Sequence, residues 1–339
     1  IPSYRQTFAE YRDITAEVDY DDDRPPAPAA LDLKLSNVCN LKCRICGPVA
    51  SSLWLQEELS VGKAEPGSFI ARLEHDRTYY RSNKITRVPE NAATFRTWLD
   101  SLEYLEFTGG EPMLSPENRE LIELIATEGR PERVGVLFNT NATTIDERIL
   151  RHLGEFREVS ACLSIDDVGA RFEYERAPAE WADVEATLAR YKERAEPAWQ
   201  LYEFCSVSIF NVWYLPEYVR WLASRSDRIA LQPTLNLVHY PRHFSIQVLP
   251  PAVKAAIAER LRREILDDPA TSERIAGAVS DVVHFMEGDR PDDAESWRAG
   301  LRVIAERDAI RGQRFADVFP EFSTLLADLD PSGTPVAIG

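Results

Sequence analysis

The chain has 339 residues, of which 44% are apolar, and it carries a net charge of −17 at pH 7. This length and apolar content suffice for a large folded core, so the composition excludes an intrinsically disordered protein. The charge argues against a nucleic-acid partner, because no stretch supplies the clustered Lys and Arg that bind phosphates. No apolar run approaches the roughly 20 residues of a membrane span, and the chain shows no secretory signal pattern, so we expect no membrane partner.

The first 30 residues are mostly polar, and they end in an acidic run at 21–23 and prolines at 25 and 26. Like charges repel one another and proline cannot extend a helix, so we expect residues 1–30 to form a lead-in segment. Residues 31–36 then alternate apolar and polar side chains, which predicts a β-strand.

Three cysteines follow this strand, at Cys39, Cys43 and Cys46. Thiolates with this C-x3-C-x2-C spacing can converge on a [4Fe–4S] cluster and leave one of its irons open. A metal site with an open position binds and activates a ligand, whereas a closed one holds structure. The triplet therefore favours a reactive iron–sulfur site.

A structural zinc site and a disulfide framework are the alternatives for these cysteines. A zinc site usually has paired C-x2-C elements, but the chain has only two further cysteines, Cys162 and Cys205, far apart. A disulfide framework is typical of small secreted domains rather than of a long chain with an odd number of cysteines. Free cysteines and an oxygen-sensitive cluster indicate the reducing cytoplasm.

Helices and strands alternate along the chain from residue 90. With the strand at 31–36, we expect strands over 104–108, 134–138, 159–165, 202–210 and 229–235. Helices are expected over 49–59, 92–102, 116–126, 145–153, 181–194 and 215–223. Repeated βα units imply a parallel sheet with right-handed crossovers. The sequence thus predicts an α/β fold, a partial (β/α)6 TIM-like barrel over residues 31–240.

Two regions depart from this alternation. Residues 61–88 lack a regular period and are rich in polar and aromatic groups, which indicates either a cap over a substrate site or a solvated connecting helix. Beyond Pro241 we expect helices over 251–266, 271–286, 294–310 and 315–328. Because no cysteine follows Cys205, residues 241–339 are predicted to be a helical C-terminal extension without a metal.

The motifs together resemble the radical SAM enzymes. The cysteine triplet matches that family's cluster motif, and Thr108-Gly109-Gly110-Glu111-Pro112 matches its GGEP motif. Segments 139–143, 164–166 and 172–176, the last leading to Trp181, resemble the branch with SPASM or twitch extensions. One departure is Ile45, where the family often has an aromatic residue. The resemblance covers about residues 31–240.

The resemblance implies an enzyme with a [4Fe–4S] cluster, S-adenosylmethionine (SAM) and an external one-electron reductant of the flavodoxin or ferredoxin type. It makes Cys39, Cys43 and Cys46 the cluster ligands. The residues that it assigns to SAM binding are Gly109, Gly110, Glu111, Asn139, Asn141, Ser164, Asp166 and Arg176. In parallel barrels such residues gather at the carboxyl ends of the strands, where these motifs are expected to fall.

Other roles remain open for several of these residues. Glu111 has the spacing of a helix cap. Asn139 and Asn141 can each bind a ribose or close an Asx turn. Arg176 suits a carboxylate, but an exposed ion pair is an equal alternative.

Polar residues also mark the expected barrel interior. The alternation of Ser160, Cys162, Ser164 and Asp166 places four small or polar groups on one strand face. Gln232, Thr234 and Asn236 share a face of the last strand, as substrate contacts or as a self-satisfied network. His239 and His243 have i,i+4 spacing but no acidic third ligand nearby, so we predict no metal site there.

The resemblance implies reductive cleavage of SAM to a 5′-deoxyadenosyl radical, which abstracts a hydrogen atom from a substrate. A net oxidation needs an electron acceptor, commonly an auxiliary cluster, which the cysteine count does not provide. We therefore expect a redox-neutral reaction, epimerisation or rearrangement, on a small natural-product-type metabolite, with Cys162 or Cys205 as hydrogen donor. The simpler alternative for both cysteines is a small hydrophobic residue. Modification of a ribosomally made peptide, and a non-catalytic iron–sulfur sensor or electron carrier, are the other interpretations.

Overall fold

The computed structural model describes residues 27–62, 68, 70–72, 74–75, 88–195, 197, 199–225, 232–288 and 293–330. The lead-in segment, most of the expected cap at 61–88 and the start of the last strand expected at 229 lie outside the described residues.

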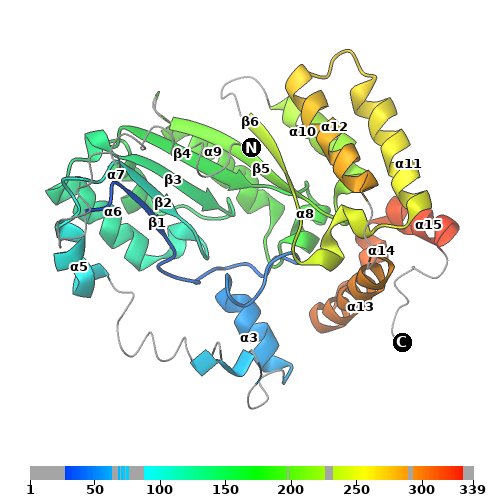
Figure 1. The fold of residues 1–339 in the computed structure, drawn as a ribbon, viewed down its shortest axis with the longest axis horizontal. Coiled ribbons are helices and arrows are strands. Elements are labelled where there is room, and N and C mark those ends of the chain that lie inside the picture. The colour runs from blue at the N-terminus through cyan, green and yellow to red at the C-terminus, as the bar shows by residue number, and fades with distance from the viewer. Residues whose placement is uncertain are drawn as a thin grey trace, which may run out of the picture.

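A six-stranded parallel sheet forms the centre of the molecule, with its strands in chain order. The strands are β1 (Ala30–Leu33), β2 (Tyr104–Phe107), β3 (Gly135–Thr140), β4 (Glu158–Ser164), β5 (Trp199–Val207) and β6 (Gln232–Leu237). Figure 1 shows them side by side, from β1 in blue to β6 in yellow-green. This confirms the predicted partial TIM-like barrel.

Helices connect the strands and are named here in chain order. They are α3 (Ser52–Ser60), α5 (Val88–Arg96), α6 (Pro116–Glu128), α7 (Glu147–Leu153), α8 (Ala170–Glu175), α9 (Trp181–Arg194) and α10 (Leu215–Ser224). Helix α6 begins as its sequence predicts, because Pro116 needs no hydrogen bond in the first turn and the Ser115 side chain caps the Asn118 amide.

The two faces of the sheet differ, as β5 shows. Its residues 199, 201, 203, 205 and 207 are buried beneath the helices, whereas residues 200, 202, 204 and 206 are partly exposed on the inner, concave side. Successive side chains point to opposite faces of the sheet along every strand. The inner face is therefore the place where a ligand can meet the sheet.

The C-terminal region is helical, as predicted, and lies at one end of the sheet (Figure 1). Its helices are α11 (Pro251–Leu261), α12 (Glu273–Glu287), α13 (Asp293–Arg311), α14 (Phe315–Val318) and α15 (Pro320–Leu329), and a π-helical turn, Arg262–Leu266, extends α11. In the described part of the chain no helix is long and apolar enough to cross a membrane.

An aromatic cluster joins these helices to the barrel. The ring centroid of Phe319 lies 5.1 Å from that of Tyr174 in α8 and 4.7 Å from that of Phe315. The ring centroid of Phe210, in the turn after β5, lies 5.0 Å from that of Phe244. Such pairs contribute about 0.5–1.5 kcal/mol each beyond the area that they bury.

Several expected boundaries were wrong. β1 ends at Leu33 rather than at residue 36, and α5 spans Val88–Arg96 rather than 92–102. β5 runs over 199–207 rather than 202–210, because the Asn211 side chain accepts a hydrogen bond from the Ser208 amide and closes a turn there. The helix expected over 315–328 is two helices, since Pro320 starts a new one.

Candidate active site

The cysteine loop follows β1 at the carboxyl end of the sheet, and hydrogen bonds to neighbouring segments fix its backbone. The Lys42 amide donates to the Ala177 carbonyl and the Arg44 amide to the Glu175 carbonyl, each at 2.7 Å. The Trp54 indole donates to the Cys43 carbonyl at 2.7 Å. The loop is thus held from both sides, by α3 on one side and by the end of α8 and the residues after it on the other.

The three loop cysteines are free thiols, and each is partly buried. Burial raises the pKa of Cys39, Cys43 and Cys46, while the Arg176 guanidinium opposes this at Cys43 and Cys46. The negative charge of the Cys46 thiolate also raises the pKa of Cys39, and the charges of Cys46 and Cys39 raise that of Cys43. A positively charged group bound between them would reverse this effect and hold all three as thiolates.

Donors already point at two of the sulfurs. The Arg176 Nη1 atom lies 3.9 Å from Cys43 Sγ, and the Asn141 Nδ2 atom lies 3.9 Å from Cys39 Sγ. Among the described residues no three His, Cys, Asp or Glu side chains are close enough to surround one metal ion. A cubane cluster offers each thiolate a separate iron, so the donor set fits that cluster better than a single zinc ion.

Glycines 109 and 110 pack against the start of the cysteine loop. A Cβ on Gly110 would lie 2.1 Å from the Val38 carbonyl oxygen, and one on Gly109 would lie 2.6 Å from that of Ser36. The Gly110 and Glu111 amides donate to the same two carbonyls, those of Ser36 and Val38. These glycines therefore serve the close approach of two backbones, whether or not a ligand also uses their edge.

Glu111 ties the ends of β2 and β3 together. Its carboxylate accepts hydrogen bonds from the Met113 amide at 3.1 Å, the Thr140 hydroxyl at 2.8 Å and the Asn141 amide at 2.7 Å. Burial raises its pKa to about 7 despite these donors. Glu111 thus caps a short helix, as the sequence allowed, and it also binds the last residue of β3 and the residue after it.

The two asparagines at the end of β3, Asn139 within the strand and Asn141 directly after it, differ. The Asn141 Oδ1 atom accepts from the Thr143 amide at 3.0 Å, which is an Asx turn, and its Nδ2 donates to Asn40 of the cysteine loop at 2.8 Å. Asn139 is exposed on the inner face, where it pairs in register with Cys162. Asn141 therefore braces the cysteine loop, and Asn139 is the one open to a ligand.

Asp166 and Arg176 form a buried pair beside the loop. The Arg176 Nε donates to Asp166 Oδ2 at 2.8 Å, and the Ser206 amide donates to Asp166 Oδ1 at 2.8 Å. Burial lowers the pKa of Arg176, but Asp166, Cys43 and Glu175 together raise it by more, so the guanidinium stays charged. Ser164 ends β4 and is only partly buried.

The two remaining cysteines lie on opposite faces of the sheet. Cys162 is on the inner-facing register of β4, opposite Asn139 and Tyr202, and burial together with the Glu106 carboxylate raises its pKa to about 12. Cys205 is fully buried on the outer side, where its Sγ donates to the Asp166 carbonyl at 3.3 Å.

The other polar candidates also have places in the fold. Thr234 and Asn236 are partly buried on β6, paired in register with Phe204 and Ser206 of the inner face. The Gln232 side chain lies outside the described residues. His239 packs on Phe285, with ring centroids 4.7 Å apart.

A model described as the Radical SAM superfamily matches residues 33–201. The chain carries a radical SAM domain. It is accordingly an enzyme whose cofactors are SAM and a [4Fe–4S] cluster. The matched residues include the cysteine loop, the two glycines, Asp166 and Arg176.

The radical SAM domain also has structural neighbours. Native anSMEcpe with bound AdoMet is 18% identical with a TM-score of 0.43, over 70% of this chain and 60% of that one. Streptococcus suis SuiB bound to S-adenosylmethionine is 11% identical with a TM-score of 0.40, over 77% and 57%. TYW1 with a lysine-pyruvate adduct bound is 14% identical with a TM-score of 0.37, over 69% and 73%.

The match spans about 60% of the length of anSMEcpe. No curated protein matches the chain significantly.

Sequence reasoning missed several residues that build this site. Trp54 falls within the helix expected over 49–59 and had no predicted role, yet its indole holds the cysteine loop. Thr140 and Ser206 bind the Glu111 and Asp166 carboxylates. Trp54 and Ser206 lie outside the motifs, and Thr140 lies within segment 139–143 but had no expected role. Only the packing of separate strands brings these residues to the site.

Proposed function

We propose that Cys39, Cys43 and Cys46 hold the [4Fe–4S] cluster of this enzyme and leave one iron for SAM. The observation that carries this proposal is the position of three free thiols on one braced loop, beside the buried Asp166–Arg176 pair. When bound, the cluster and SAM supply a 5′-deoxyadenosyl radical that removes a hydrogen atom from an unactivated C–H bond. The protein's part is to position SAM and substrate and to keep water out.

The SAM-binding roles fall to residues around the loop. The carbonyl edge of Gly109 and Gly110 would accept the SAM ammonium, since the amide edge at Gly110 and Glu111 is already bonded to the loop. Arg176 would face the SAM carboxylate with the part of its fork that Asp166 leaves open. Ser164 and Asn139, at the exposed inner edge, would bind the nucleoside.

We place the enzyme in the SPASM/twitch-type branch, as a member whose C-terminal extension has no auxiliary-cluster cysteines. The reaction that we propose is redox-neutral, an epimerisation or rearrangement of a small metabolite. The substrate would lie on the inner face of the sheet, against Cys162, Tyr202 and Phe204.

We propose Cys162 as the hydrogen donor. Its raised pKa keeps the sulfur as a thiol, the form that can give up a hydrogen atom. The S–H bond breaks as a C–H bond forms on the substrate radical, leaving a thiyl radical on Cys162. One electron from a flavodoxin- or ferredoxin-like reductant and one proton from water restore the thiol. Cys205 is the weaker candidate, because it is fully buried on the other face.

The cluster assignment is tested by anaerobic reconstitution with iron and sulfide, followed by dithionite and SAM. We expect a brown protein that forms 5′-deoxyadenosine and a colourless Cys39→Ala variant that does not. A wild-type protein that keeps its cluster but forms no 5′-deoxyadenosine would be a carrier or sensor. A colourless wild-type protein after reconstitution would contradict the proposal.

The donor assignment is tested with metabolite extracts in D₂O. We expect wild type to shift one component by one mass unit, and Cys162→Ala to form 5′-deoxyadenosine without that shift. Cys205→Ala is the matched control and should behave as wild type. A shift that survives in Cys162→Ala would exclude Cys162 as donor, and a shifted component in the peptide fraction would exclude a small metabolite.

A further inference from the structure

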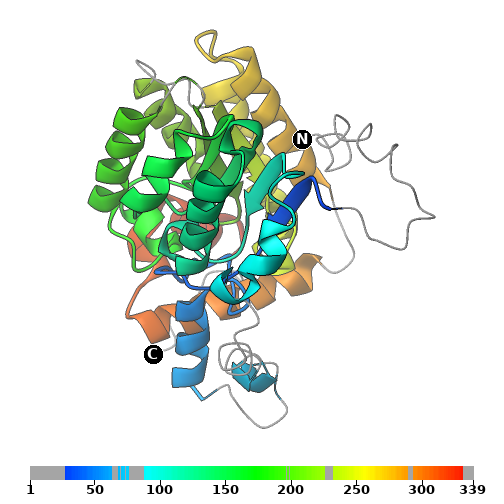
Figure 2. The same cartoon turned by 90° about the vertical axis from the view of Figure 1, so that its left-hand side faces the viewer.

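Helix α13 of the C-terminal region lies against the cysteine loop and α3 (Figure 2). Three cations meet on the buried carboxylate of Glu57 in α3. The Lys42 Nζ atom lies 2.5 Å from it, the Arg307 Nη1 atom 3.2 Å and the Arg311 Nη2 atom 3.0 Å. Arg307 also pairs with Glu58. One acidic turn of α3 thus joins the cysteine loop to α13.

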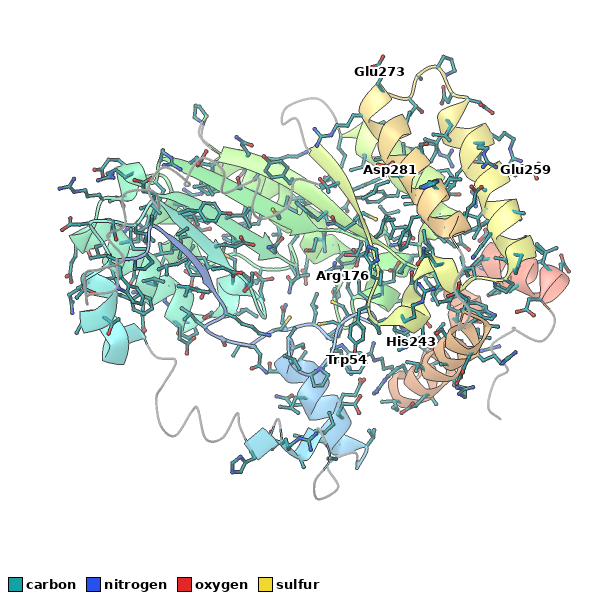
Figure 3. All side chains as sticks on the ribbon, in the orientation of Figure 1. Trp54, Arg176, His243, Glu259, Glu273 and Asp281 are labelled. Carbon is teal, nitrogen blue, oxygen red and sulfur yellow. The ribbon has the colours of Figure 1, made fainter. Side chains whose placement is uncertain are left out.

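Trp54 links this charge network to a cluster cysteine. Its ring lies 4.5 Å from the Arg307 guanidinium carbon and 5.0 Å from that of Arg311. The indole N–H of the same ring donates to the Cys43 carbonyl at 2.7 Å. Figure 3 shows Trp54 between the sheet and the C-terminal helices, on the side where Arg176 lies. Two arginines of α13 therefore fix the ring that holds Cys43.

A second contact joins α13 to the residue after Cys43. The Arg44 Nη2 atom donates to Asp308 Oδ1 at 2.6 Å, and its guanidinium stacks 3.5 Å from the centre of the Tyr174 ring. Asp308 also accepts from the Tyr174 hydroxyl at 2.8 Å and the Phe315 amide at 2.7 Å. Arg44 is 3% exposed, so its charge depends on these partners rather than on water.

We propose that α13 is a positioning element of the cluster site, acting through Arg307, Asp308 and Arg311 on Trp54 and Arg44. This inference rests on the proposed function, since it assigns the C-terminal helix a role toward the cluster at the cysteine loop. The residues do not touch the reacting atoms. They orient the loop backbone that carries the thiols, in the way that hydrogen-bond partners of metal ligands orient those ligands in other metal sites.

The energetics favour a fixed helix over a movable lid. Withdrawing α13 would break the ion pairs of Arg307 with Glu57 and Glu58, of Arg311 with Glu57 and of Asp308 with Arg44 at the same time. Breaking a buried ion pair costs far more than breaking a pair on the surface. We therefore infer that α13 stays in place during turnover, and that substrate reaches the site from the inner face of the sheet.

Three variants test the positioning role. Trp54→Phe keeps an aromatic ring for the arginines but removes the N–H donor to Cys43. Arg311→Gln removes one cation of the network. Arg302→Gln, at an exposed arginine on the same helix, is the matched control.

The first readout is the rate at which a chelator strips iron from the reconstituted protein, together with the electron paramagnetic resonance spectrum of the reduced cluster. We expect Trp54→Phe and Arg311→Gln to lose iron at least about tenfold faster than wild type, with altered g-values, because the loss of such partners typically costs roughly 10–100-fold in metal affinity. Arg302→Gln should match wild type. Equal rates and spectra in all four proteins would overturn the proposal.

The second readout is amide hydrogen exchange over residues 39–46 in the metal-free protein. Faster exchange in Trp54→Phe than in Arg302→Gln supports the proposal, and equal exchange contradicts it. This measurement needs no cluster, so it still decides the role of α13 if wild type fails to bind iron and the proposed function falls. Where Arg311→Gln does not fold, the milder Trp54→Phe decides.

Discussion

Replacing Glu203 by Gln is predicted to stabilise the protein at neutral and alkaline pH. Glu203 is 0% exposed on the outer face of β5, and neither of its carboxylate oxygens has a hydrogen-bond partner among the described residues. Burial raises its pKa to about 7, although Arg225 and Lys192 act in the opposite direction. In the described structure a charge there has no hydrogen-bond donor to replace the water that it loses.

The magnitude follows from the two pKa values. The folded protein holds this proton up to about pH 7, whereas an ordinary Glu releases it near 4.5, and this difference at 1.36 kcal/mol per pH unit is about 3 kcal/mol. Because the folded state binds the extra proton, wild type loses this stability as the pH rises from about 4.5 to about 7. The amide introduced by Glu203→Gln cannot ionise, so this variant loses none of that stability.

The assay is urea unfolding of the metal-free protein under anaerobic conditions, from about pH 4 to about pH 8. We expect Glu203→Gln to be about 3 kcal/mol more stable than wild type at the alkaline end, with a gap that shrinks toward pH 4. Glu193→Gln removes an exposed carboxylate from α9 and is the control, with a gap near zero throughout. Parallel stability profiles for wild type and Glu203→Gln would refute the reasoning.

Two further substitutions test the cysteine loop and its support. Gly110→Ala would place a Cβ 2.1 Å from the Val38 carbonyl oxygen, so we expect a loss of at least about 2 kcal/mol in unfolding free energy. Gly47→Ala, in the cysteine loop itself, meets no atom within 4 Å and should cost little. Burial raises the pKa of Glu57, but hydrogen bonds from Arg311 and Lys42 lower it by more, so that the pKa is about 2. The stabilisation that the Glu57 carboxylate provides is thus present above about pH 4.5 and is lost as the pH falls toward 2. Glu57→Gln should therefore be about 3 kcal/mol less stable than wild type at pH 7, and the two stabilities should converge in acid. A stability difference that does not change with pH would contradict this.

Local patterns were enough to predict the barrel. Alternating apolar residues and helical repeats fixed the order of the βα units, because each unit buries one face of its own strand and helix. The cysteine spacing and the GGE segment likewise indicated the site, since both are contiguous in sequence. What those patterns left open was the exact end of a strand. The end of β5 depends on a side-chain bond from Asn211 that no periodicity reveals.

Long-range contacts account for most of what the sequence did not predict. Glu57 and Arg307 are 250 residues apart in the chain, and each lies in a helix rich in charges. Arg307 and Arg311 share one helix face, but this i,i+4 spacing is just as typical of a solvated surface. Only the fold reveals that the face is buried against Trp54. The expectation of a plain helical extension was correct in structure but said nothing of this contact.

The order of synthesis adds a consequence to the contact between α13 and the cysteine loop. Residues 39–46 leave the ribosome long before residues 307–315, so a nascent chain carries its thiols on a loop that still lacks Arg307, Asp308 and Arg311. Iron delivered at that stage would meet a loop without its final brace. The cysteine loop therefore gains its full set of contacts only after α13 has been synthesised and has docked.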